Sequence, residues 1–211
     1  MSIEILQKDY LLKKQRIQSR LKEFEQIISQ GDEKIFEELC FCILTANTSA
    51  KAGIKSIEYL KPILLTGNTQ QLANALISSG YRFPNKRAEY IITARNFLQK
   101  ELNFKIKEKI LSFKDKESLR LYIINNIKGL GPKESSHFLR NIGFKGYSIL
   151  DKHIINTLYE YQILSQPTKP KNYKHYLEIE QKYKEFAQQL NINENELDLL
   201  LWSRKNGEIL K

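Results

Sequence analysis

Ile127-Lys128-Gly129-Leu130-Gly131-Pro132-Lys133 is the stretch that decides the fold of this 211-residue chain. Two glycines separated by one apolar residue allow positive φ on both sides of a tight turn, while Leu130 anchors the turn in a core. Pro132 suits the start of a helix. The stretch predicts a hairpin between two helices, whose backbone amides and helix N-terminus can hold a phosphate without reading sequence. A glycine turn alone is also typical of helix connections that bind nothing.

Helical periodicity runs through the rest of the chain. Apolar residues recur at spacings of three and four, and no convincing β-branched alternation of period two is bounded by turns, so we expect an all-α fold. A helix that begins after Gly31-Asp32, with Asp32 as its cap, is predicted to bury an apolar stripe. That stripe consists of Ile35, Leu39, Cys42 and Ala46. Further helices are expected over about 5–29, 49–64, 69–78, 85–100, 116–127, 132–143, 153–161, 172–190 and 194–204.

The charge of the chain favours an anionic partner. A formal net charge of +10 and a pI of about 9.4 are typical of nucleic-acid binders, although many lysine-rich proteins merely carry a solvated surface. Lys86, Arg87 and Arg95 make the helix expected at 85–100 strongly basic. Residues 1–15 are too polar for a secretory signal, and no apolar run approaches the roughly 20 residues that a bilayer demands. We therefore expect a cytoplasmic protein.

The two cysteines, Cys40 and Cys42, alternate with apolar residues and are interpreted as buried core thiols. A zinc or iron–sulfur site would need about four suitably spaced ligands, and a disulfide framework needs more cysteines than these. We therefore expect neither a metal ligated by cysteines nor a disulfide.

A family resemblance rests on the hairpin and its continuation. Leu-Gly-Pro-Lys-Glu-Ser-Ser-His-Phe-Leu-Arg-Asn-Ile-Gly at 130–143, followed by Ile-Leu-Asp-Lys-His-Ile at 149–154, resembles the helix-hairpin-helix, Gly/Pro and Asp signature of DNA glycosylases. Within that superfamily it is similar to the archaeal-type 8-oxoguanine glycosylases/lyases of the Ogg2 branch. The resemblance extends to 44–49, 81–83 and 202–211, and it departs from the usual residues at Pro132 and Lys152.

This resemblance implies a two-lobed helix-hairpin-helix glycosylase fold with its active site in the cleft between the lobes. We expect about 30–125 to form one lobe, and about 1–29 with 126–211, including the hairpin at 127–133, to form the other. The implied activity is excision of 8-oxoguanine from double-stranded DNA and strand cleavage by β-elimination. We expect the protein to be a monomer that does not bind a membrane and that associates with the nucleoid through DNA.

Lys133 is the catalytic nucleophile that the resemblance implies. A Schiff base requires an amine, and the positive end of the helix beginning near Pro132 disfavours the ammonium form of a lysine in its first turn. On spacing alone, Lys133 would be one more surface lysine. Asp151 follows 18 residues later and is expected both to cap a helix and to stabilise positive charge on the sugar, assisting proton transfer around the lysine.

The damaged base must leave the duplex before any enzyme can reach it. The resemblance makes Asn47 the candidate that fills the gap, and a turn asparagine is the alternative. Trp202 and Phe83 are candidates for stacking on the extruded purine, although both could be core aromatics. Lys211 is implied in recognition of the base. Hairpin contacts to DNA are assigned to Lys128, Gly129 and Gly131.

His153 and His137 are interpreted as structural hydrogen-bonding residues, because no partner stands at metal-ligand spacing. No organic cofactor is implied, while hairpin carbonyls from Ile127 to Gly131 offer oxygen ligands to a monovalent cation. An endonuclease III-like glycosylase for oxidised pyrimidines is the main alternative, but the chain has no cysteine after Cys42 for the cluster that many of those enzymes carry. An adenine-excising relative usually lacks the lysine. A non-catalytic hairpin module would bind DNA irrespective of damage.

Overall fold

The computed structural model describes residues 3–210, and every regular element among them is helical. The helices in chain order are α1 (Ile3–Ile27), α2 (Asp32–Thr45), α3 (Ala50–Leu60), α4 (Thr69–Ser78), α5 (Pro84–Leu102), α6 (Ile106–Leu111), α7 (Lys116–Asn126), α8 (Pro132–Asn141), α9 (Lys152–Glu160), α10 (Tyr173–Gln189) and α11 (Glu194–Asn206). Short 3₁₀ turns occupy Ile28–Gln30 and Lys61–Ile63. The predicted all-α class is confirmed. None of the described helices has the length and apolarity to cross a membrane.

Packing divides the chain into two units. Unit 1 comprises residues 1–25 and 143–211, and unit 2 comprises residues 26–142. The expected lobes placed the hairpin and its second helix with the N-terminal helix. In the structure, α8 instead packs on α2 and α7, so residues 126–142 fall in unit 2 and the boundary lies at Gly143 rather than near 125.

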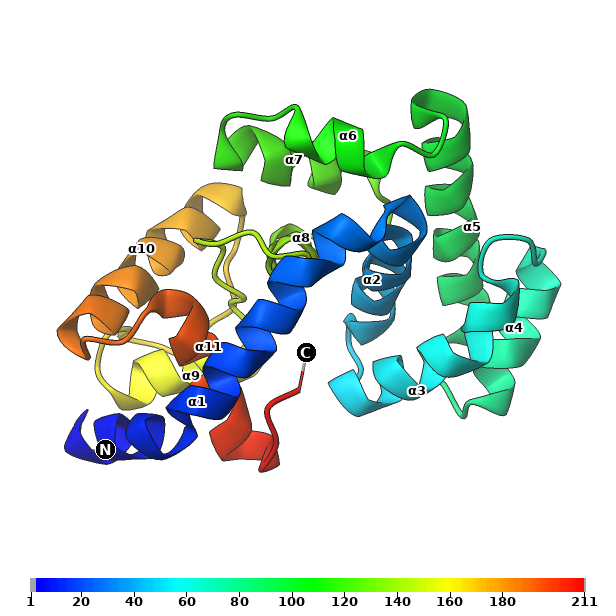
Figure 1. Cartoon of the computed structure of the whole chain (residues 1–211). Helices are drawn as coiled ribbons and strands as arrows, with labels where there is room; N and C mark the ends of the chain where they lie inside the picture. The colour runs from blue at the N-terminus through cyan, green and yellow to red at the C-terminus, as the bar shows by residue number, and fades with distance from the viewer. Residues whose placement is uncertain (1–2, 211) are drawn as a thin grey trace. The chain divides into compact units, whose positions relative to one another are not determined.

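Unit 1 is built from α1, blue in Figure 1, and from α9–α11, which run there from yellow to red. Apolar residues of α1 pack into one core with residues that follow Leu150. The aromatic members of that core are Tyr10, Phe24, Tyr176, Tyr183 and Phe186. Polar contacts also join α1 to α11: Tyr10 and Gln18 both donate to the Glu196 carboxylate. These contacts fix α11, the helix that carries Trp202.

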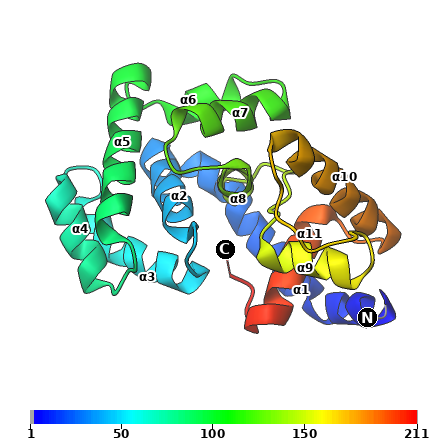
Figure 2. The ribbon, with the colours of Figure 1, turned by 180° about the vertical axis from the view of Figure 1, so that it is seen from behind.

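Unit 2 is organised around α2, which contacts α3, α5, α6 and α8. Every residue of α2 from Glu38 to Thr45 is buried, so this half of the helix is enclosed on all sides. Figure 2, seen from behind, shows α4 lying along α5, as Figure 1 does. The apolar stripe predicted for α2 is buried as expected, although it forms only part of the buried surface of that helix.

Asp32 does not cap α2 as predicted. Gly31 precedes α2 with φ 97° and offers no side chain, while the Asp32 carboxylate accepts a hydrogen bond from the backbone N–H of Lys107 at 2.8 Å. Asp32 therefore satisfies an amide in the first turn of α6. That helix was not predicted, because six residues are too few to establish a periodicity.

Candidate functional site

The hairpin forms between α7 and α8 as expected, but only one of its two glycines uses positive φ: Gly131 is extended, with φ −92°. Gly129 has φ +93°, and Leu130 is buried beneath the turn, where its N–H donates to the Ile127 carbonyl at 3.2 Å. The Gly131 carbonyl accepts from the N–H of Ser135 at 2.9 Å and so begins α8. The N–H groups of Gly129 and Gly131 donate to no group among residues 3–210. Two backbone donors next to a helix N-terminus make a site suited to an anion.

Buried polar contacts fix the two helices that flank the hairpin. Arg120 of α7, which is 1% exposed, donates to the Ser136 hydroxyl of α8 at 3.1 Å and pairs with Glu117. Asn141, at the end of α8, donates to the buried Glu38 carboxylate of α2 at 3.2 Å. These side chains are costly to bury without partners, so their pairing holds α8 in one register.

Lys133 is the second residue of α8, directly after the hairpin. Its side chain is 26% exposed, and its Nζ lies 2.9 Å from the Glu134 carboxylate. The amine is therefore accessible, and its neighbour Glu134 holds it in the first turn of α8. This position is the one expected for the candidate nucleophile.

Asp151 caps α9, as predicted. Its Oδ1 accepts the backbone N–H groups of His153 at 2.9 Å and Ile154 at 2.8 Å, so the carboxylate is held in one orientation. Asp151 belongs to unit 1 and Lys133 to unit 2. Their joint action in one site therefore stays a prediction.

Trp202, on α11, is half-buried against the core of unit 1. The His153 ring stands edge-on to the indole, with centroids 5.5 Å apart and an interplanar angle of 77°. His153 thus has an aromatic contact in place of the hydrogen bond predicted for its side chain. His137 also packs edge-on to an aromatic ring, that of Phe41, at 5.6 Å.

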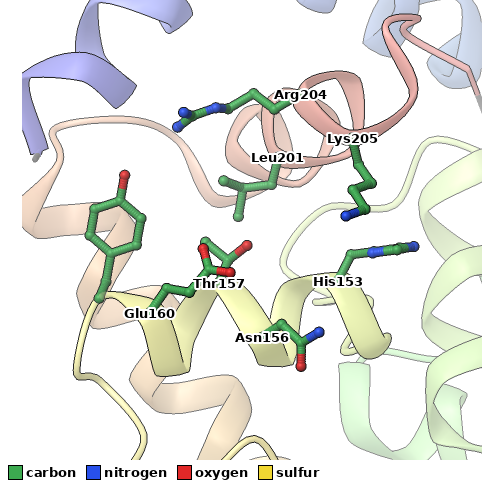
Figure 3. A pocket seen from close by; sticks show the side chains of 8 residues that line it. His153, Asn156, Thr157, Glu160, Leu201, Arg204 and Lys205 are labelled. Atoms are coloured by element: carbon green, nitrogen blue, oxygen red, sulfur yellow. The ribbon is translucent and has the colours of Figure 1, made fainter. Parts of the chain in front are cut away.

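A pocket of about 260 Å³ opens between α9 and α11 beside this aromatic pair. Figure 3 shows the Lys205 side chain reaching toward His153 at one end of the pocket. Arg204, also in its lining, is paired with Asp9 at 3.1 Å. The pocket and Trp202 share His153, so a group bound here would adjoin the indole.

Asn47 lies in the turn between α2 and α3, exposed and with φ 64°. A non-glycine residue in this left-handed region is uncommon and is often found at functional turns. The turn is fixed from α5 and the segment before it: Arg87 donates to the Ala46 carbonyl at 2.6 Å, and the Tyr81 hydroxyl donates to the Leu44 carbonyl. Asn47 is therefore a rigidly presented surface side chain.

Phe83 immediately precedes α5 and is 37% exposed, with the Arg82 guanidinium 5.0 Å from its ring centroid. It is a surface aromatic rather than a core one. Lys128, in the hairpin, is exposed as well. The remaining candidate, Lys211, lies outside the described residues.

The basic helix α5 has a different character from the one predicted. Arg87 and Arg95 are each 8% exposed, and Arg95 donates to the carbonyls of Leu64 at 3.0 Å and Gly67 at 2.8 Å. Both arginines hold turns of unit 2 in place, whereas Lys86 stays on the surface. Sequence reasoning also missed Tyr90 and Arg120. Each has partners nearby in the sequence, but the contacts that matter for the hairpin, with Gly129 and with Ser136, join segments that no local signal connects.

Cys40 and Cys42 are free thiols buried in α2, as predicted. Burial raises the pKa of the Cys40 thiol well above its usual range, which makes it unreactive. Residues 3–210 contain no group of three or more His, Cys, Asp or Glu side chains that could hold a metal ion.

Residues 17–192 match the family model of 8-oxoguanine DNA glycosylase. An 8-oxoguanine DNA glycosylase/AP lyase of Korarchaeum cryptofilum is 43% identical over 92% of this chain and 90% of its own length. The crystal structure of a Methanocaldococcus jannaschii 8-oxoguanine glycosylase/lyase, in complex with a 15mer DNA containing 8-oxoguanine, aligns with a TM-score of 0.89 and 37% identity, over 99% of this chain and all of the other. The 8-oxoguanine DNA glycosylase of Thermotoga maritima aligns with a TM-score of 0.90 and 31% identity, over 99% and 98% of the two chains.

Proposed function

Because this chain belongs to the 8-oxoguanine DNA glycosylase family, we propose that it excises 8-oxoguanine from double-stranded DNA and then cleaves the strand, beginning base excision repair. The observation that carries the proposal is the hairpin: two unpaired backbone donors, at Gly129 and Gly131, lead directly into the helical turn that holds Lys133. A module that only clamped DNA would need the donors but no amine at this position.

Lys133 is the proposed nucleophile. Its neutral amine attacks C1′ of the damaged nucleotide, and the N-glycosidic bond breaks with its electron pair on the departing base, which takes up one amine proton. The C1′–O4′ bond then opens, O4′ takes up the second amine proton, and the nitrogen stays bound to C1′ as a Schiff base. Loss of a proton from C2′ then expels the 3′ phosphate by β-elimination. Hydrolysis of the imine releases Lys133. In the absence of DNA, the ion pair with Glu134 keeps the amine beside the hairpin.

Asp151 is the proposed electrostatic partner of Lys133. Its two hydrogen bonds from the α9 backbone hold the carboxylate ready, so no reorganisation is needed when positive charge develops on the sugar. We assign it the proton transfers around the lysine as well. Since the two residues belong to different units, the reaction requires both.

Recognition of the extruded base is assigned to Trp202 and Phe83, with Lys211 at the base edge. Aromatic faces stack on any purine, whereas 8-oxoguanine differs from guanine by an N7 donor and an O8 acceptor. Polar groups near the base must therefore distinguish the two. Asn47, presented rigidly by its turn, is the proposed side chain that fills the vacated space in the duplex. Lys128 and the two glycines bind the backbone.

The test is borohydride trapping on duplexes that carry one 8-oxoguanine, one thymine glycol or no damage. We expect a covalent adduct on the 8-oxoguanine duplex only, and we expect Lys133→Gln to lose the adduct and strand cleavage while retaining damage-selective binding. Trapping on the thymine-glycol duplex alone would show that the protein excises oxidised pyrimidines instead. If no duplex is trapped, the reading as a non-catalytic binding module is preferred; if Lys133→Gln loses binding as well, the lysine is mainly a phosphate contact.

The protein is proposed to act as a monomer, in the cytoplasm and on nucleoid DNA. Sedimentation of the protein with an equimolar duplex tests this state: a 1:1 complex is expected, and a 2:1 complex would contradict it. The monovalent cation at the carbonyls of Ile127 to Gly131 also stays a prediction. Replacing potassium by a bulky organic cation at constant ionic strength should then weaken DNA binding.

A further inference from the structure

Tyr90, on α5, packs directly on the hairpin. A Cβ atom added to Gly129 would lie 2.5 Å from Cδ2 and 2.8 Å from Cε2 of the Tyr90 ring. Real Cβ atoms do not approach other atoms so closely, so the ring occupies the space that any other residue at 129 would need. The Tyr90 ring therefore packs against the turn at Gly129, the hairpin residue with positive φ.

Three cationic side chains surround the same ring. The ammonium groups of Lys86 and Lys128 lie 5.4 Å and 5.8 Å from its centroid, and the Arg87 guanidinium carbon lies at 5.4 Å. The negative face of an aromatic ring attracts cations at such distances. Arg87 is buried and already bonded to the Ala46 carbonyl, whereas both lysines are exposed. The ring thus draws together two surface ammonium groups from α5 and the hairpin.

We propose that Lys86 and Lys128, positioned by Tyr90, form a second phosphate site beside the hairpin amides and bind the DNA backbone there. This inference rests on the proposed function and extends it to residues of α5. Two ammonium groups that both lie within about 6 Å of one ring centroid repel each other, and a bound phosphate offsets that repulsion. The neighbouring N–H of Gly129 donates to no described group, so it can bind the same strand.

Glu89 is the competing anion at this site. Its carboxylate lies 3.4 Å from Lys86, and both side chains are more than half exposed. Such an exposed ion pair contributes little to stability, so a phosphate can replace Glu89 at little cost. Tyr90 itself is a positioning residue, since its contribution acts through the lysines and the turn.

The experiment measures the salt dependence of equilibrium binding to an undamaged duplex and to the same duplex with one 8-oxoguanine. Lys86→Ala and Lys128→Ala should each weaken binding to both duplexes by the same factor and reduce the slope of log K against log salt by about 0.9. The ratio of the wild-type binding constant to that of each variant then falls roughly 3.5-fold between 50 and 200 mM salt. Lys100→Ala is the matched control, because it removes the same charge from an exposed position of the same helix. A slope for Lys86→Ala equal to that of Lys100→Ala overturns the proposal.

Substitutions of Tyr90 test the positioning role. Tyr90→Phe retains the ring and should keep the wild-type slope, while Tyr90→Leu should reduce the slope by up to about 1.8, the sum of two lysine contacts. The control is Tyr59→Leu on α3, where Lys55 stands 6.0 Å from the ring in the same kind of pair. If Tyr90→Leu melts at the wild-type temperature and keeps its slope, the ring has no positioning role and that part of the proposal is wrong.

Failure of this inference is distinguishable from failure of the proposed function. The wild-type protein should give a borohydride adduct on 8-oxoguanine DNA whichever residues bind phosphate. An adduct combined with unchanged slopes in the variants overturns only the second phosphate site. If the wild-type protein forms no adduct and shows no salt-dependent binding, both the proposed function and the second phosphate site are wrong.

Discussion

The hairpin at 127–133 and the α9–α11 region differ in the kind of group that we propose they offer to DNA. In the hairpin, the donors are the backbone N–H groups of Gly129 and Gly131, which any phosphate satisfies. In α9–α11, the groups are side chains: the Asp151 carboxylate bonded to its own helix, and the Trp202 indole edge-on to His153. We infer that affinity for DNA and action on the lesion are carried by separate stretches of sequence. A substitution in the hairpin should therefore weaken DNA binding without changing action on the lesion, and a substitution in α9–α11 should do the reverse.

The largest expected effect comes from Asp151→Asn. Asparagine caps a helix as well as aspartate does, so α9 and the thermal stability should change little. Removal of the charge should slow base release by about 10²- to 10⁴-fold, the range for a positioned acid or base. Single-turnover excision from an 8-oxoguanine duplex measures the rate, and calorimetry measures stability. Near-normal turnover would remove Asp151 from the mechanism.

Trp202 should affect selectivity more than affinity. Stacking on a base contributes about 1–3 kcal/mol, so Trp202→Leu should lower binding to damaged DNA roughly 10- to 100-fold and leave binding to undamaged DNA unchanged. Trp202→Phe, which keeps an aromatic face, should lose less. Because the chain has one tryptophan, its fluorescence reports this residue alone, and quenching by an 8-oxoguanine duplex is expected. Equal losses on both duplexes would show that the indole only maintains the fold.

Gly129→Ala should have the converse effect. A left-handed conformation costs a non-glycine residue about 1–2 kcal/mol, and here the added carbon also displaces Tyr90. Binding should weaken roughly tenfold on damaged and undamaged duplexes alike, since a hydrogen bond to phosphate is lost. Gly80→Ala is the control: its φ is +78°, but its Cβ would meet nothing within 4 Å. If the two variants lose affinity and stability equally, the contact with Tyr90 has no role.

The smallest expected effect comes from Glu89→Gln. Removing the carboxylate beside Lys86 frees that ammonium group for phosphate, and exposed pairs contribute under about 1 kcal/mol, so affinity should rise about two- to threefold on any duplex. Glu101→Gln, at the other end of α5, removes the same exposed charge. An equal rise in both variants would be a simple effect of net charge.

The sequence predicts those features of this protein that depend on neighbouring residues. The expected helix at 69–78 coincides with α4, and the local signals Pro132 and Asp151 mark the starts of α8 and α9. Features that depend on distant partners could not be predicted. Asp32 bonds to an amide 75 residues away, and the partners of Arg87 and Arg95 lie 28 to 41 residues away.

The candidate site divides in the same way. Its hairpin conformation follows from two glycines and a proline, whereas the roles of Lys133 and Asp151 came from the family resemblance. Nothing local distinguishes Lys133 from the other lysines of a lysine-rich chain. The support from Tyr90 became visible only when α5 and the hairpin were placed together in one unit.

Unit 1 is discontinuous in sequence, and this has a consequence for synthesis on the ribosome. Helix α1 is synthesised before unit 2, but its core partners from Leu150 onward are synthesised after unit 2. All of unit 2 lies between them as one continuous segment, free to fold as it emerges. Until then the apolar face of α1, which includes Leu6, Ile17 and Phe24, lacks the residues that bury it in the folded protein. In the nascent chain, α1 therefore stays open to aggregation and to chaperones until translation reaches α11.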